Sequence, residues 1–71
     1  MSIKIVAPMP GTIINILVNG GEEVLEYQEV LSLEARKMEN AIPSAEAGTV
    51  KEIKVNVNDK VATNQVLMVL E

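Results

Sequence analysis

One lysine in this chain stands where its side-chain amine could react with another molecule. Residues 34–40 read Glu-Ala-Arg-Lys-Met-Glu-Asn, and they lie between two stretches rich in strand-forming residues. A tight turn must join the two strands, so Lys37 is expected at the tip of a hairpin, within reach of another enzyme. A primary amine in that position is a candidate acceptor for a covalently attached group. Surface lysines are common and usually only solvated, so the rest of the sequence must decide.

The composition excludes several other kinds of chemistry. The 71 residues include no Cys and no His, which removes disulfides, the usual metal ligands and the Ser-His or Cys-His pairs of nucleophilic catalysis. No metal site is expected. The net charge is −4 and Tyr27 is the only aromatic residue, whereas nucleic-acid-binding proteins need basic surfaces and stacking rings. No nucleic-acid partner is therefore expected.

The length predicts a single small domain covering residues 1–71, close to the lower size limit for folding without disulfides or metals. No apolar run approaches the length needed to span a bilayer, and no signal peptide is visible at Met1. We expect no direct membrane insertion and a cytoplasmic location, either as a free protein or as part of a longer one.

The chain contains an internal repeat. Residues 11–34 align without a gap on residues 48–71, a shift of 37 positions, with nine identities where chance at ordinary composition gives about one or two. Two copies are too few for a solenoid, so the half-repeats, about residues 3–34 and 40–71, are expected to pack on each other about a pseudo-two-fold axis. The identical pairs are Gly11/Gly48, Thr12/Thr49, Ile16/Ile53, Val18/Val55, Asn19/Asn56, Val24/Val61, Gln28/Gln65, Leu33/Leu70 and Glu34/Glu71.

Each half is predicted to consist of strands. Strands are expected at residues 3–5, 12–18, 29–34 and 65–70 and along the apolar residues Val50, Ile53 and Val55, with short strands at Val24 and Val61. The apolar spacing slips once between Ile13 and Ile16, and at the same place in the second half, which predicts a bulge or a strand break in each half. The four glycines are interpreted as turn residues.

These features predict an all-β fold in which two small antiparallel sheets pack face to face as a flattened barrel or sandwich with an internal pseudo-two-fold repeat. A small open barrel of the SH3 type is the alternative. The repeat also places Lys37, because its partners under the shift fall outside the chain. The hairpin of residues 35–39 is therefore expected at one end of the domain and both chain ends at the other.

The turn itself lacks turn residues. A two-residue hairpin turn requires positive φ at both central positions and favours Asn-Gly. If Arg36 and Lys37 are those residues, each is strained by about 1–3 kcal/mol, and such strain is often kept for function.

The segment Glu34-Ala35-Arg36-Lys37-Met38-Glu39 resembles the attachment site of the biotinyl/lipoyl domain family, whose biotin branch has Glu-Ala-Met-Lys-Met-Glu with the lysine modified. Ala7-Pro8-Met9-Pro10-Gly11-Thr12 and Ile42-Pro43-Ser44 resemble the family's openings of the two halves, so the resemblance covers nearly the whole chain. Arg36 departs from the pattern, because the family has its first methionine there. Met38 favours the biotin carboxyl carrier branch over the lipoyl branch, which typically has Asp-Lys-Ala.

The resemblance implies a function and partners. It implies a non-catalytic barrel-sandwich carrier domain with biotin attached covalently to Lys37 by a biotin protein ligase. The arm would carry CO2 between a biotin carboxylase and a carboxyltransferase or decarboxylase subunit. Ligase recognition would involve the flanking residues Glu34, Ala35, Arg36, Met38 and Glu39. Met38 could instead fill a core gap, and Glu34 and Glu39 could be only a solvated rim.

Two other functions stay open on the sequence alone. One is a lipoyl carrier of an oxo-acid dehydrogenase or glycine cleavage system. The other is an unmodified barrel-sandwich interaction domain, which Arg36 would permit.

Overall fold

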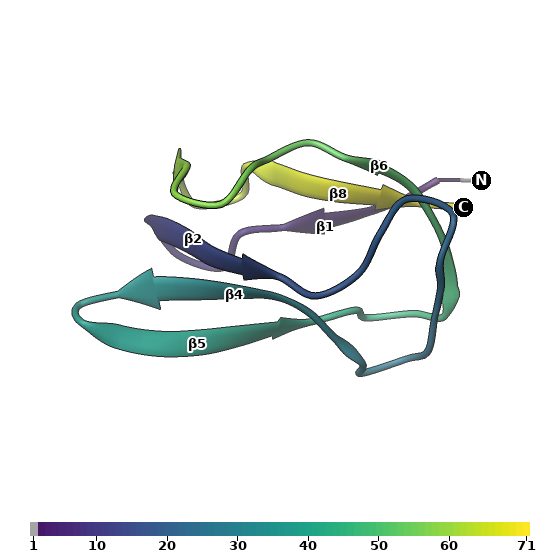
Figure 1. Cartoon of the computed structure of the whole chain (residues 1–71), viewed down its shortest axis with the longest axis horizontal. Coiled ribbons are helices and arrows are strands. Elements are labelled where there is room, and N and C mark those ends of the chain that lie inside the picture. Colours follow the sequence, from purple (N-terminus) through teal and green to yellow (C-terminus); the bar gives the residue numbers. More distant parts are fainter. Residues whose placement is uncertain (1) are drawn as a thin grey trace.

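The computed structural model describes residues 2–71 and contains eight strands in two four-stranded antiparallel sheets (Figure 1). The predicted fold, a flattened sandwich of two small sheets, is confirmed. Residues 2–71 form no helix, and so none long and apolar enough to cross a membrane. The strands are β1 (Ile3–Val6), β2 (Gly11–Ile16), β3 (Glu23–Val24), β4 (Glu29–Ala35), β5 (Met38–Pro43), β6 (Gly48–Ile53), β7 (Lys60–Val61) and β8 (Val66–Leu70).

Each sheet takes strands from both halves of the chain. The strand order is β1-β8-β6-β3 in one sheet and β5-β4-β2-β7 in the other. The first half thus supplies the two outer strands of the first sheet and the two inner strands of the second, and the second half does the reverse. Neither half can complete a sheet alone, so the halves interlock rather than pack as separate lobes.

The predicted repeat is visible in the hydrogen bonds as well as in the strands. The Asn19 N–H donates to the Glu22 carboxylate at 3.1 Å, and the Asn56 N–H donates to the Asp59 carboxylate at 2.8 Å. The Gln28 side chain caps the next turn by accepting from the Leu25 N–H at 2.9 Å, as Gln65 does from the matching residue of the second half at 3.0 Å. The repeated polar residues therefore hold the same turns in the two halves.

Apolar residues on the facing sides of the two sheets form one core. The inner strands β4 and β8 are the most buried, which agrees with their dense apolar sequence. Leu33 and Leu70, equivalent under the repeat, are both fully buried. The largest fully buried apolar side chains are Ile13, Val24, Val30, Leu31, Leu33, Val50, Leu67, Met68 and Leu70.

Of the bulge and the strand break that the sequence left open, the structure has the bulge, because β2 and β6 are continuous and their register shifts at matching places. The β2–β4 register shifts between Ile13 and Asn15, and the β6–β8 register shifts between Val50 and Glu52. The extra residue in each strand returns the next apolar side chain to the core side, which accounts for the slip in the sequence pattern.

The interpretation of Gly11 and Gly48 as turn residues is wrong, because they begin strands β2 and β6. They are glycines because the backbone of the neighbouring inner strand lies very close. A Cβ on Gly11 would overlap the Glu34 carbonyl oxygen, and one on Gly48 would lie 3.2 Å from the Glu71 carbonyl oxygen. The sequence pattern cannot distinguish a glycine kept for close approach from one kept for a turn.

We predict that Gly11→Ala lowers the free energy of unfolding by about 1–3 kcal/mol, because the added methyl group must displace the backbone at the end of β4. Gly20→Ala is the matched control, since nothing lies within 4 Å of a Cβ placed there, and its effect should stay within about 0.5 kcal/mol. Urea denaturation of the two variants measures the difference. Equal stabilities would contradict the proposed close approach.

Candidate functional site

Strands β4 and β5 form a hairpin with a two-residue turn. Ala35 pairs with Met38, so Arg36 and Lys37 are the two central residues. Both have positive φ, 55° for Arg36 and 65° for Lys37. This is the conformation that the sequence predicted for the case in which these two residues are central, and it matches the type I′ turn that the right-handed twist of two-residue hairpins favours.

The turn is strained because neither central residue is of a type that tolerates positive φ. A residue with a Cβ in the left-handed region costs about 1–2 kcal/mol, whereas Asn or Gly at the same place costs little. Neither side chain gains compensating burial, because Arg36 and Lys37 are both exposed. A strained, exposed pair at a hairpin tip is typical of a turn retained for the side chains it presents.

The turn lies at one end of the long axis of the molecule, and the chain ends lie at the other (Figure 1). Ile3 pairs with Leu70 at that other end, in the position equivalent to the Leu33–Asn40 pair of the hairpin. The arrangement predicted from the repeat is therefore confirmed. No carboxylate lies within 4.0 Å of the Lys37 Nζ among residues 2–71, so no ion pair holds the amine against the body.

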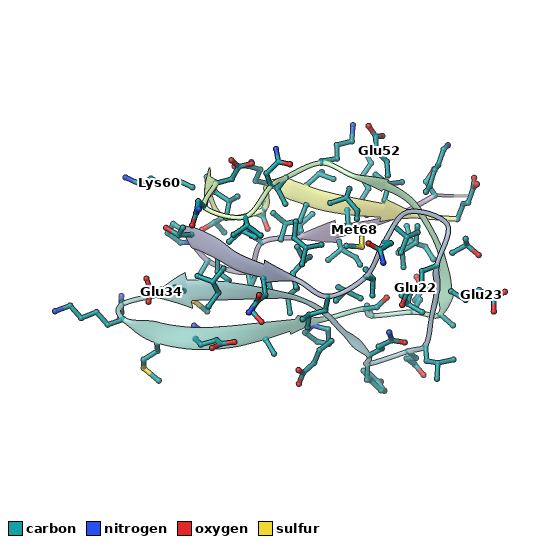
Figure 2. The ribbon with its side chains drawn as sticks, viewed as in Figure 1. Glu22, Glu23, Glu34, Glu52, Lys60 and Met68 are labelled. Atoms are coloured by element: carbon teal, nitrogen blue, oxygen red, sulfur yellow. The ribbon has the colours of Figure 1, made fainter. Side chains whose placement is uncertain are left out.

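The outer face of the hairpin carries two acidic residues directly opposite each other. Glu34 on β4 pairs with Glu39 on β5, and both are exposed. Like charges in directly opposite positions of a sheet are destabilising. Figure 2 shows Glu34 close behind the tip. The solvated rim considered from the sequence is thus present, and it gives the tip a negative outer face.

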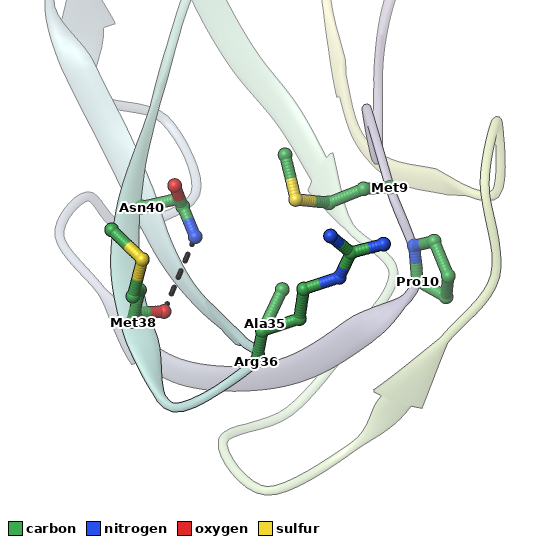
Figure 3. Close-up of a pocket in the computed structure, with 6 residues that line it drawn as sticks. All are labelled: Met9, Pro10, Ala35, Arg36, Met38 and Asn40. Carbon is green, nitrogen blue, oxygen red and sulfur yellow. Dashed lines mark hydrogen bonds between the residues drawn. The ribbon is translucent and has the colours of Figure 1, made fainter.

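The inner face of the hairpin extends beyond the core and lines a shallow recess of about 490 Å³ (Figure 3). Met38 is 66% exposed, so it does not fill a gap in the core. The Asn40 side chain donates to the Met38 carbonyl at 3.2 Å, which ties β5 locally beneath the turn. The recess is lined by Met9, Pro10, Ala35, Arg36, Met38 and Asn40.

The structure thus gathers the predicted site residues at one tip, but on two faces. Glu34 and Glu39 occupy the outer face, whereas Ala35, Arg36 and Met38 border the recess. The site predicted from the sequence did not include Met9 and Pro10, because their segment was interpreted only as the opening of the first half. Among residues 2–71, no group of three His, Cys, Asp or Glu side chains could hold a metal ion.

Comparison with known proteins decides the family. The biotin–lipoyl family model, described as "Biotin-requiring enzyme", matches residues 3–70. The chain belongs to the biotin–lipoyl family. Its sequence is 56% identical over 50 residues to the biotin carboxyl carrier protein of Streptococcus mutans, a match that covers 70% of this chain and 38% of that protein. This supports the biotin carboxyl carrier branch that the motif suggested.

Other members of the biotin–lipoyl family are much longer. The mitochondrial propionyl-CoA carboxylase alpha chain of Homo sapiens is 37% identical over 65 residues, which is 92% of this chain and 9% of that one. The dihydrolipoyllysine-residue acetyltransferase component of the Haemophilus influenzae pyruvate dehydrogenase complex is 40% identical over 60 residues, 84% of this chain and 11% of that one. The chain therefore spans well under half the length of these relatives.

A solved structure shows the same fold. The Kluyveromyces lactis urea carboxylase matches with a TM-score of 0.94 over 100% of this chain and 6% of that one, at 20% identity. The strand exchange between the halves is thus shared with a domain of a far larger protein.

The strain in the turn can be tested by substitution. We predict that Arg36→Asn raises the free energy of unfolding by up to about 1 kcal/mol, because Asn tolerates the left-handed conformation. Arg36→Ala is the matched control, since it removes the same charge but keeps the strain, and it should give no gain. Thermal unfolding monitored by circular dichroism compares the variants, and an equal gain for both would assign the effect to charge.

Proposed function

We propose that this chain is a biotin carboxyl carrier domain and that biotin is attached to the Nζ of Lys37. The observation that supports this most is the position of that amine, on a strained two-residue turn at the end of the molecule furthest from the chain ends. Membership of the biotin–lipoyl family and the similarity to a biotin carboxyl carrier protein support the choice of biotin.

The residues at the tip fit a covalent arm. Lys37 is exposed and makes no ion pair among residues 2–71, so a ligase can reach its amine without unfolding the hairpin. The Nζ would attack the acyl carbon of biotinoyl-adenylate, forming an amide bond as AMP and a proton leave. The lysine charge is lost in this step, and no described residue loses an ionic partner as a result.

The chain's own contribution to catalysis is positioning. The β4–β5 hairpin holds the attachment point away from the core, and the lysine side chain with the attached acyl chain reaches on the order of 10–15 Å further. When bound, biotin supplies a nitrogen that carries CO2. A stiff turn limits the ordering entropy lost when the tip enters an active site, and tethering supplies an effective concentration of order millimolar.

The partners follow from this function. A biotin protein ligase would contact both faces of the tip, with Glu34 and Glu39 on one side and Ala35, Arg36 and Met38 on the other. A biotin carboxylase would load the arm, and a carboxyltransferase or decarboxylase would unload it. The domain itself would be non-catalytic.

We predict that the purified protein gains the mass of one biotinyl group when incubated with a biotin protein ligase, biotin and ATP, and that Lys37→Arg abolishes the gain while leaving the circular dichroism spectrum unchanged. Lys60→Arg, which changes an exposed lysine outside the hairpin, is the matched control and should be modified like the wild type. Intact-mass spectrometry is the measurement. An unmodified wild-type protein would favour the interaction-domain alternative, and a lipoyl-sized gain with a lipoate ligase alone would favour the lipoyl carrier.

Arg36 is the one residue of the motif that departs from the family pattern, and it borders the recess beside the turn. We predict that Arg36→Met raises the rate of biotinylation, because the guanidinium presents a charge where ligases of this family meet an apolar side chain. Initial rates at equal ligase concentration give the comparison. An equal or lower rate would show that Arg36 does not hinder the ligase.

A further inference from the structure

Because of the internal repeat, a segment of the first half can be compared with its counterpart in the second half. Residues 22–29 and their counterparts 59–66 form the same short strand, turn and strand start, and the backbone hydrogen bonds agree. The Tyr27 N–H donates to the Ser44 carbonyl at 2.7 Å, and the Asn64 N–H donates to the Ala7 carbonyl at 2.8 Å. Differences between the two segments are therefore not required by the fold.

Tyr27 is the most unusual of these differences. Its φ is 67°, and the equivalent Asn64 has the same φ of 67°. Asn tolerates this conformation, whereas a bulky aromatic residue rarely adopts it. The Tyr27 side chain is 74% exposed, so packing against the body does not offset the strain. The only aromatic residue of the chain is thus held in an unfavourable conformation, in solvent, where the second half uses Asn.

The residues around Tyr27 also differ from their counterparts in the second half, because they include a larger exposed apolar side chain and more acidic residues. Leu25 is 70% exposed where the second half has Ala62. The segment also contains four Glu and no Lys or Arg, whereas residues 59–66 contain one acidic and one basic residue. The other six acidic residues of the chain balance its six basic ones, so residues 22–29 account for the entire net charge of −4. The four acidic residues are Glu22, Glu23, Glu26 and Glu29.

This segment lies far from the lysine. Glu29 starts β4 and pairs with Pro43, seven positions from the turn, which is about 23 Å along a strand. Figure 2 shows Glu22 and Glu23 at the end of the molecule opposite Glu34. A partner bound to residues 22–29 would leave the β4–β5 turn free.

We propose that residues 22–29 form a docking surface for a protein component of the carboxylase assembly, one whose contact surface is an apolar recess ringed by Lys and Arg. Tyr27 and Leu25 would enter this recess of the partner protein, and the four carboxylates would pair with the Lys and Arg side chains around it. Exposed aromatic residues are the usual anchors of protein interfaces, and a single-sign rim steers association. A second copy of the chain is disfavoured, because two such acidic rims repel each other.

This inference rests on the proposed function and gives the docking surface a role in it. It would hold the carrier domain to the assembly through the end opposite the attachment site, so that the arm can move between active sites without dissociation of the domain. Binding through this surface should therefore not depend on the Lys37 side chain or on its modification.

The repeat provides the test variant. Leu25→Ala combined with Tyr27→Asn copies the residues of the second half, so the variant should fold with a melting temperature equal to or above that of the wild type. The biotin carboxylase and the carboxyltransferase components of the source organism, each purified, are titrated with the carrier by calorimetry at 50 and 300 mM NaCl. We expect wild-type binding to one component that weakens with salt, and at least tenfold weaker binding of the variant.

Two matched controls accompany this experiment. Leu17→Ala removes another exposed apolar side chain, one outside the segment, and Lys37→Arg changes the attachment residue. Both should bind within twofold of the wild type. The double variant should also be biotinylated like the wild type. If neither the wild type nor the double variant is biotinylated, the proposed function is contradicted. The docking proposal is judged separately, from the binding measurements alone.

Three results would overturn the proposal. They are the absence of wild-type binding to either component, binding of the double variant within twofold of the wild type, and a lowered melting temperature of the double variant, which would make Tyr27 structural. Sedimentation velocity adds a fourth, since a wild-type dimer abolished in the double variant would assign the surface to self-association.

Discussion

The two sheets can form only together, because each is completed by strands from the other half of the chain. The inner strands β4 and β8 carry most of the fully buried side chains, and each is flanked by a strand from its own half and one from the other. Local segments of this chain therefore have little to stabilise them before the halves meet. Once they meet, one core and two four-stranded sheets hold the body together, and the β4–β5 hairpin is anchored in this body through the pairing of β4 with β2.

The hairpin is the place where the symmetry of the molecule ends. Throughout the body the same polar residues hold the same turns in both halves, as the Asn19–Glu22 and Asn56–Asp59 hydrogen bonds show. At the tip, β4 continues into β5 through Arg36 and Lys37, whereas the equivalent strands β8 and β1 simply end side by side. The structural repeat does not explain the residues at this tip, which are strained, exposed and flanked by opposed carboxylates.

Much of this could be predicted from the sequence, for physical reasons that differ between residues. The repeat revealed the symmetry, because residues such as Val24/Val61 and Leu33/Leu70 face equivalent parts of one core. The phase slip near Ile13 predicted an irregularity, either a bulge or a strand break, because side-chain alternation is strict in a strand. The hairpin turn was predictable to within residues 35–38, because the strands on either side leave only these residues for it, and the pairing of Ala35 with Met38 selects Arg36 and Lys37 as its centre.

Other features depend on contacts between distant residues and could not be predicted. The exchange of strands between the halves depends on which edges pair in space. Gly11 was misinterpreted because its constraint is the carbonyl of Glu34, more than twenty residues away. Met9 and Arg36 line the same recess only because the pairing of β2 with β4 places them on the same side of the molecule (Figure 3). Tyr27 gave no signal in the sequence, because its strain is visible only in the backbone conformation.

The account depends on one amine being carried at a solvent-exposed tip so that a cofactor can be attached there. The most direct measurement is peptide mapping by tandem mass spectrometry of the protein isolated from its native host. The account predicts a biotinyl group on Lys37 and on no other lysine. A protein that carries no biotin in a host whose other biotin-dependent enzymes are fully modified, or that carries it on a different residue, would contradict it.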